Sequence, residues 1–160
     1  MKIIKYFFEF LFIFLFFFIF KIIGYKNASN FGEVIGKKIG PLFRSKSKII
    51  ENLENSNVGS SKKEREIIIE KMWGNYGRIL SEYIFLKQFR KNNLNKFLKI
   101  EGSEILDDIK KNNEQVIFIS GHFNNFELMA MEIEKFGLNL CAIYRPLNNP
   151  FLNVIMERIR

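Results

Sequence analysis

The pattern of hydrophobic positions divides the chain into an almost continuously apolar start and a longer part in which apolar and polar positions repeat regularly. Every residue from 10 to 20 is apolar, and only Glu9 and Lys21 interrupt the apolar positions on either side of this run. The whole stretch, residues 6–23, is near the lower limit of about 17–25 residues for a helix that crosses a bilayer. We expect residues 1–23 to form a membrane anchor that either spans the bilayer or lies in its inner leaflet. A signal peptide is the alternative, because lysines precede the run, although no convincing cleavage site follows it.

A long helix is predicted after a polar loop at residues 55–61. Ser61 and Glu64 stand three residues apart, as in a capping box that marks the start of a helix. Apolar residues then recur at steps of three and four, which places them on one face: Ile69, Met72, Trp73, Tyr76, Ile79, Leu80 and Tyr83. Such a face is more typical of a protein core than of a ligand site, and the helix is expected to end near Arg90.

Three short segments in the second half predict β-strands that alternate with helices. Residues 116–119, Val-Ile-Phe-Ile, are continuously β-branched or aromatic, which is typical of a strand buried on both faces. The other two predicted strands are residues 97–101 and 138–144. Strands and helices that alternate with short connections indicate a parallel sheet with right-handed crossovers. We therefore expect an α/β fold, with an anchor helix at residues 1–23 and a body of helices and a parallel sheet at residues 24–160.

Charge and composition narrow the classes of partner. The net charge of +8 favours anionic partners, and a basic run without an acidic residue extends from Lys37 to Lys48. This run is either an ordinary solvated face or a surface that rests on anionic lipid headgroups. Lysines are denser after the apolar run than before it, which favours a cytoplasmic body. With one histidine and one cysteine we expect no metal site, and without a nucleotide loop or RNA-recognition motif we expect no nucleic-acid partner.

The candidate chemistry centres on the only histidine, His122, which follows the middle predicted strand, with Glu127 five residues later. A neutral imidazole oriented by a carboxylate can take a proton from a hydroxyl near neutral pH. The ligand cleft of a parallel sheet lies beyond the carboxyl ends of its strands, where His122 and Arg145 are both expected to fall. In the alternative interpretation, Glu127 only caps a helix that begins at Asn124 or Asn125, and Arg145 is a surface charge.

Three motifs follow one another in this half of the chain. They are Lys-Ile-Glu-Gly-Ser-Glu at residues 99–104, Val-Ile-Phe-Ile-Ser-Gly-His-Phe-Asn-Asn-Phe-Glu at 116–127, and Tyr-Arg-Pro-Leu-Asn-Asn-Pro at 144–150. In this order they resemble the late (lauroyl/myristoyl-type) lipid A biosynthesis acyltransferases of the lysophospholipid acyltransferase superfamily. Members usually read His-Phe-Gly-Asn-Trp-Glu, so the chain departs from the pattern at Asn124 and Phe126, and neither departure removes a titrating group.

The resemblance implies acyl transfer from an acyl-carrier-protein thioester to a hydroxyl of a lipid A precursor. It places the enzyme among the lipids of the bacterial inner membrane, on the cytoplasmic face, with no metal and no cofactor beyond the acyl donor. By the motif, His122 is the catalytic base and Glu127 its carboxylate partner. Substrate contacts are expected from Tyr144, Arg145 and Asn125, and less strongly from Arg160.

Two further expectations concern the extent and the class of the protein. Family members are about twice as long as this chain, so residues 24–160 are expected to be the N-terminal half of the acyltransferase domain. The alternatives are another acyltransferase of the superfamily, acting on a glycerolipid or glycolipid, and an inactive membrane-bound scaffold that uses the basic surface.

Overall fold

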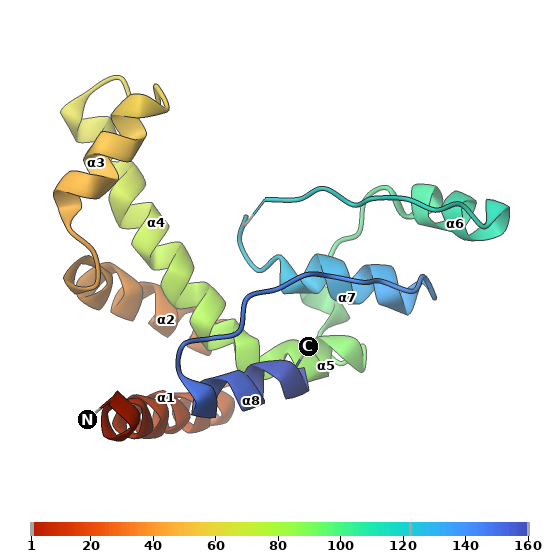
Figure 1. Ribbon diagram of the computed structural model, residues 1–160, viewed down its shortest axis with the longest axis horizontal. Helices are drawn as coiled ribbons and strands as arrows, with labels where there is room; N and C mark the ends of the chain where they lie inside the picture. The colour runs from red at the N-terminus through yellow and green to blue at the C-terminus, as the bar shows by residue number, and fades with distance from the viewer. Residues whose placement is uncertain (1, 122, 160) are drawn as a thin grey trace. The chain divides into compact units, whose positions relative to one another are not determined.

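The computed structural model describes residues 2–121 and 123–159, and the regular elements of this part of the chain are all helices (Figure 1). The α-helices are α1 (Lys2–Ile23), α2 (Tyr25–Ile39), α3 (Lys46–Asn55), α4 (Lys62–Glu82), α5 (Leu86–Arg90), α6 (Ser103–Asn112), α7 (Glu127–Lys135) and α8 (Pro150–Ile159). Short 3-10 turns occur at η1 (Gly40–Leu42), η2 (Tyr83–Phe85) and η3 (Asn95–Phe97). Contacts define two compact units: Phe16–Tyr83, and the chain up to Leu15 together with the chain from Ile84 onward.

The expected parallel α/β sheet is wrong, because the described residues contain no β-strand. Apart from Phe97 in η3, the segments predicted as strands lack regular structure, and several of their apolar side chains face solvent. Ile117 is 89% exposed and Ile119 94% exposed. A strand exists only where a neighbouring strand pairs with its backbone N–H and C=O groups. No such pairing forms among the described residues, so apolar composition alone predicted strands that the tertiary structure does not make.

The predicted long helix is confirmed as α4, and its start carries the expected cap. Ser61 Oγ accepts a hydrogen bond from Glu64 N–H at 3.2 Å, and the Glu64 carboxylate accepts one from Ser60 N–H at 2.7 Å. The chain stays helical through η2 and α5 to Arg90, where the prediction placed the end. Helices α6 and α7 likewise form between the segments that had been expected to be strands.

Glycines, and not large apolar residues, line the face of α4 that packs against α2. A Cβ atom added at Gly77 would collide with the backbone of Gly32, and one added at Gly36 would collide with the carbonyl oxygen of Trp73. Helix backbones approach this closely only where small residues occupy the contact. Because the glycine face makes the contact, Tyr76 stays 57% exposed, although its spacing predicted a place on the buried face.

The unit formed by Phe16–Tyr83 also contains a small apolar core between α3 and α4. Its buried side chains are Ile49, Ile69 and Trp73. Three partly buried residues pack against them: Ile50, Leu53 and Met72. The apolar repeat of α4 therefore serves packing at its N-terminal half, as the spacing predicted.

In the other unit, α5 lies against α7, and the start of α8 lies against the first part of α1. Arg90 Nη1 and Glu134 Oε2 are 2.9 Å apart, joining α5 to α7. Among the described residues, α1 alone is long and apolar enough to cross a membrane, judged by length and composition. A signal sequence passes the same test, so the anchor at residues 1–23 and the body at residues 24–160 stay predictions.

Candidate active site

The loop before α7 takes an unusual backbone path at Asn124. This residue has a φ of 48°, in the left-handed region, and its carbonyl oxygen accepts a hydrogen bond from Phe126 N–H at 3.1 Å. Glycine adopts this conformation without strain, and asparagine is the side chain that tolerates it best. Asn124 therefore adopts a conformation open to glycine, the residue that stands at this position in the usual His-Phe-Gly-Asn-Trp-Glu pattern.

The expected start of the helix at Asn124 or Asn125 is wrong. Phe126 is the N-cap of α7 and its side chain makes no capping hydrogen bond, so Glu127 is the first residue of the helix and not the third. Its side chain is partly buried. The N-terminal end of a helix favours a negative charge, because the first N–H groups of the helix have no partner within it. The first position of α7 therefore suits a carboxylate.

Three other residues were predicted to belong to the site, and the structure describes one of them, Asn125. Asn125 is 9% exposed and lies two residues before Glu127, within the turn that leads into α7. His122 and Arg160 lie outside the described residues, so their roles stay predictions.

The third motif, at residues 144–150, forms a loop that α8 holds at several points. The Tyr144 hydroxyl donates to Glu157 Oε1 at 2.7 Å, and Asn153 Nδ2 donates to the same oxygen at 2.8 Å. Leu147 N–H donates to Asn153 Oδ1 at 2.9 Å. Arg145 is exposed in this loop. The predicted substrate contacts Tyr144 and Arg145 are thus carried by a loop whose shape depends on α8.

Sequence reasoning missed one residue of this loop, Asn149, which is 6% exposed. Its Oδ1 accepts hydrogen bonds from Phe151 N–H at 3.1 Å and Leu152 N–H at 3.3 Å, and so caps α8. The available signal was an asparagine directly before a proline, since asparagine is favoured at the N-cap and proline at the first helical position.

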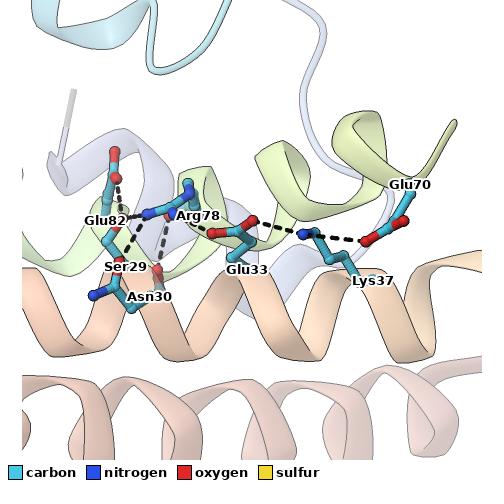
Figure 2. A network of polar contacts seen from close by, with 8 residues as sticks. Ser29, Asn30, Glu33, Lys37, Glu70, Arg78 and Glu82 are labelled. Atoms are coloured by element: carbon cyan, nitrogen blue, oxygen red, sulfur yellow. Dashed lines mark hydrogen bonds and ion pairs between the residues drawn. The ribbon is translucent and has the colours of Figure 1, made fainter. Parts of the chain in front are cut away.

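A polar network joins α2 to α4 along their glycine contact (Figure 2). Arg78 is its centre: the guanidinium donates to Ser29 Oγ at 2.9 Å, to Asn30 Oδ1 at 3.2 Å and to the carboxylate of Glu33. Ser29 Oγ in turn donates to Glu82 Oε1 at 2.7 Å. Burial, reinforced by the nearby Glu82 carboxylate, raises the pKa of Tyr25 to about 12.

Lys37, from the basic run, also belongs to this network. Its Nζ lies 2.8 Å from Glu33 Oε1 and 3.2 Å from Glu70 Oε1. The hydrogen bond from Lys37 lowers the pKa of the Glu33 carboxyl, with a further contribution from the Arg78 charge, and the same hydrogen bond raises the pKa of Lys37. Lys37 is therefore a structural residue, whereas Lys38 and Arg44 of the same run are exposed.

Comparison with known proteins agrees with the resemblance seen in the motifs. The chain is 28% identical over 130 residues to lipid A biosynthesis acyltransferase 2 of Shigella flexneri, covering 79% of this chain and 40% of that protein. It is 24% identical over 127 residues to the lipid A biosynthesis myristoyltransferase of Escherichia coli (strain K12), covering 79% of this chain and 39% of that protein. The chain thus spans about 40% of the length of these curated relatives.

No solved structure matches the chain significantly. The family model for bacterial lipid A biosynthesis acyltransferases, however, matches residues 1–160. A match over this whole length includes both motifs that carry the candidate site. The chain therefore belongs to the bacterial lipid A biosynthesis acyltransferase family.

Proposed function

We propose that the protein is a membrane-associated O-acyltransferase that moves a fatty acyl chain from an acyl-carrier-protein thioester to a hydroxyl of a lipid A precursor. The observation that carries the proposal is the position of Glu127. It opens α7 instead of completing a capping box, and it stands five residues after the only histidine of the chain. A carboxylate in that position suits the orientation of a catalytic imidazole.

In the proposed reaction, His122 removes the proton from the acceptor hydroxyl as its oxygen attacks the thioester carbonyl carbon. Glu127 selects the productive tautomer of the imidazole and stabilises the imidazolium that forms, as the carboxylate of a catalytic triad does. The tetrahedral intermediate then collapses, the carbon–sulfur bond breaks, and the imidazolium returns its proton to the leaving thiolate of the carrier. General base catalysis of this kind contributes about 10²–10⁴-fold to the rate.

Arg145 is proposed to bind negative charge. Its exposed guanidinium can pair with a phosphate of the lipid acceptor or with the oxyanion of the intermediate, since arginine forms paired hydrogen bonds to such groups. Tyr144, held by Glu157, would fix the direction of the adjacent Arg145 backbone. Asn125 would support the turn that presents Glu127.

Membrane association is proposed to rest on α1 and on a second surface in the turn after α2. We call this the α2-turn surface: Leu42 is 83% exposed and Phe43 81% exposed, and they stand between the exposed cations Lys38 and Arg44. Exposed apolar groups flanked by cations suit the boundary between acyl chains and anionic headgroups. We place this surface at the cytoplasmic face of the inner membrane.

The test is acyl transfer by the purified full-length protein, with an acyl-carrier-protein thioester as donor and a lipid A precursor as acceptor. His122→Ala and Glu127→Ala should each lower kcat/KM by at least about 10²-fold while leaving membrane association intact. Glu134→Gln is the matched control, because Glu134 lies on the same helix in an exposed ion pair with Arg90. Turnover retained by His122→Ala would refute the mechanism, whereas an absence of acyl transfer by the wild-type protein would favour an inactive scaffold.

A further inference from the structure

The turn that follows α5 is strongly basic and has no part in the chemistry described so far. Residues 83–100 contain five lysines or arginines and no acidic residue. We propose that this turn is a docking surface for an acidic protein, namely the carrier protein of the proposed acyl donor. The inference rests on the proposed function, because that reaction requires a thioester borne by a protein, and it adds where on this chain that protein binds.

Two of the five cations are already paired within the protein. Arg90 pairs with Glu134 of α7, and Lys99 Nζ lies 2.5 Å from Glu101 Oε1. The other three are exposed, and no carboxylate among the described residues forms an ion pair with them: Lys87, Lys91 and Lys96. We call these three lysines the α5-turn surface. Their charges remain available to an anionic partner from outside the chain.

The backbone that carries the α5-turn surface is fixed by its own hydrogen bonds. Lys91 N–H donates to the Lys87 carbonyl oxygen at 3.2 Å, and Asn93 N–H donates to the Gln88 carbonyl oxygen at 3.0 Å. Asn92, between them, has a φ of 63°, which is the left-handed conformation typical of a residue that ends a helix. A surface with a fixed backbone loses little conformational freedom when a partner binds.

The spacing of the first two lysines suits a helical partner. Lys87 and Lys91 stand four positions apart, which places them on the same side of consecutive helical turns. Phe89, between them, is fully buried, so the two lysines lie on the outer side of α5. Carboxylates at the same spacing on an acidic helix could face them in pairs. Cations at the end of a helix also stabilise the helix itself, so stability has to be measured beside binding.

The apolar groups of this turn favour an acidic protein over an anionic membrane as the partner. Phe97 and Ile100 are only 43% and 42% exposed, whereas Leu42 and Phe43 of the α2-turn surface are 83% and 81% exposed. The ammonium of Lys96 lies 5.1 Å from the centre of the Phe97 ring, so the ring cannot enter hydrocarbon without bringing the charge with it. The α5-turn surface therefore offers little apolar area to a bilayer.

The polar residues of the turn agree with a protein partner. Exposed asparagines stand among the cations: Asn92, Asn93 and Asn95. Their amides can donate to carboxylates and accept from backbone N–H groups of a partner. Charged and amide groups around a small apolar centre are typical of the polar rim of a protein–protein interface.

The α5-turn surface belongs to the same unit as the described residues of the candidate site. Helix α5 packs against α7, and the ion pair between Arg90 and Glu134 joins them. Glu127 opens α7 seven residues before Glu134, which is about 10 Å along the helix. A carrier protein bound at α5 would thus leave the first turn of α7 open, as a donor whose thioester must enter the site requires.

Donor kinetics of the purified full-length protein test the proposal. The α5-turn variant replaces its three lysines by glutamine. The matched control removes the same charge from α4, where three lysines are equally exposed: Lys62→Gln, Lys63→Gln and Lys71→Gln. We expect the α5-turn variant to raise the KM for the acyl-carrier-protein thioester about tenfold with kcat unchanged, and the control to change neither. An equal rise in KM in the control, or an unchanged KM in the α5-turn variant, would overturn the proposal.

Binding of purified acyl carrier protein, measured by fluorescence anisotropy without acceptor, separates the docking surface from the proposed function. Binding that is lost in the α5-turn variant alone, with no acyl transfer by the wild type, would refute the proposed function and leave the docking surface standing. Acyl transfer by the wild type with equal carrier binding in all three proteins would do the reverse. Weaker binding of the α5-turn variant to anionic vesicles, with unchanged carrier binding, would assign the surface to lipid headgroups and overturn the proposal. Unfolding midpoints of the three proteins show whether the lysines act on stability instead.

Discussion

Replacing Gly77 by alanine tests whether direct backbone contact holds α2 against α4. The added Cβ would lie 2.8 Å from the carbonyl carbon of Gly32 and 2.9 Å from the Cα of Gly36, besides colliding with the Gly32 carbonyl oxygen. These are backbone atoms that cannot rotate away, so α2 would have to move. Gly74→Ala, one turn earlier on α4, is the matched control.

The Gly74→Ala control differs because the atoms that its added Cβ would approach can move. A Cβ at Gly74 would approach Glu33 Cγ and Lys37 Cε at 3.0 Å each, and both belong to flexible side chains. Alanine is favoured over glycine inside a helix by about 0.5–1 kcal/mol. Overpacking a close contact costs about 1–3 kcal/mol. We therefore expect Gly77→Ala to lower the free energy of unfolding by about 1–2 kcal/mol, and Gly74→Ala to change it by less than about 0.5 kcal/mol.

Denaturant unfolding of the purified full-length protein in detergent, followed by helical circular dichroism, measures both variants against the wild type. The difference in the free energy of unfolding between Gly77→Ala and Gly74→Ala is the informative quantity, since both variants make the same chemical change on the same helix. If Gly77→Ala proved as stable as Gly74→Ala, the backbone contact would not be what holds the two helices together.

Three further predictions concern single contacts of the two units. Asn149→Asp keeps an acceptor for the cap of α8 but loses the Nδ2 donor to the carbonyl oxygen of Tyr6 and places a second carboxylate near Glu9. It should therefore lower the unfolding midpoint by more than Asn148→Asp does at the exposed neighbouring position, and equal midpoints would show that the Asn149 contacts do not stabilise the unit. The lowered pKa of Glu33 predicts a contribution to stability that is present above its ordinary value of 4.5 and lost as the pH falls below it. Glu33→Gln should flatten that acid dependence, and an unchanged pH profile would count against the Lys37 and Arg78 contacts. Neutralising the exposed cations of the basic run, Lys38, Arg44, Lys46 and Lys48, should weaken binding to anionic vesicles and reduce the salt dependence of that binding. Lys37→Gln should instead lower stability.

Local signals explain what the sequence by itself determined. The apolar run predicted α1, the pairing of Ser61 with Glu64 predicted the start of α4, and the motif order predicted the family that the whole-length match then confirmed. The two helical features each depend on one continuous segment of the chain, and the family depends on residue types that can be read directly from the sequence. A helix forms its hydrogen bonds within its own segment, so its position can be predicted from that segment.

Tertiary structure decided the features that depend on partners elsewhere in the chain. Residues 116–119 have the composition of a buried strand, but a strand needs a neighbour, and Ile119 stays exposed without one. The spacing along α4 predicted a face of large apolar residues toward its partner, whereas the glycines of α2 and α4 allow a closer backbone contact and make the interface instead.

The same distinction applies to the candidate site and to α1. Glu127 fitted a capping box by spacing, yet the left-handed conformation of Asn124 delays the helix start to Glu127 itself. An almost uniformly apolar helix carries no sign of which face meets protein and which meets lipid. Only tertiary contacts, such as the hydrogen bond from Asn149 to the carbonyl oxygen of Tyr6 in one unit, show which side of a helical turn is covered, because burial is a property of the packed molecule and not of the residue.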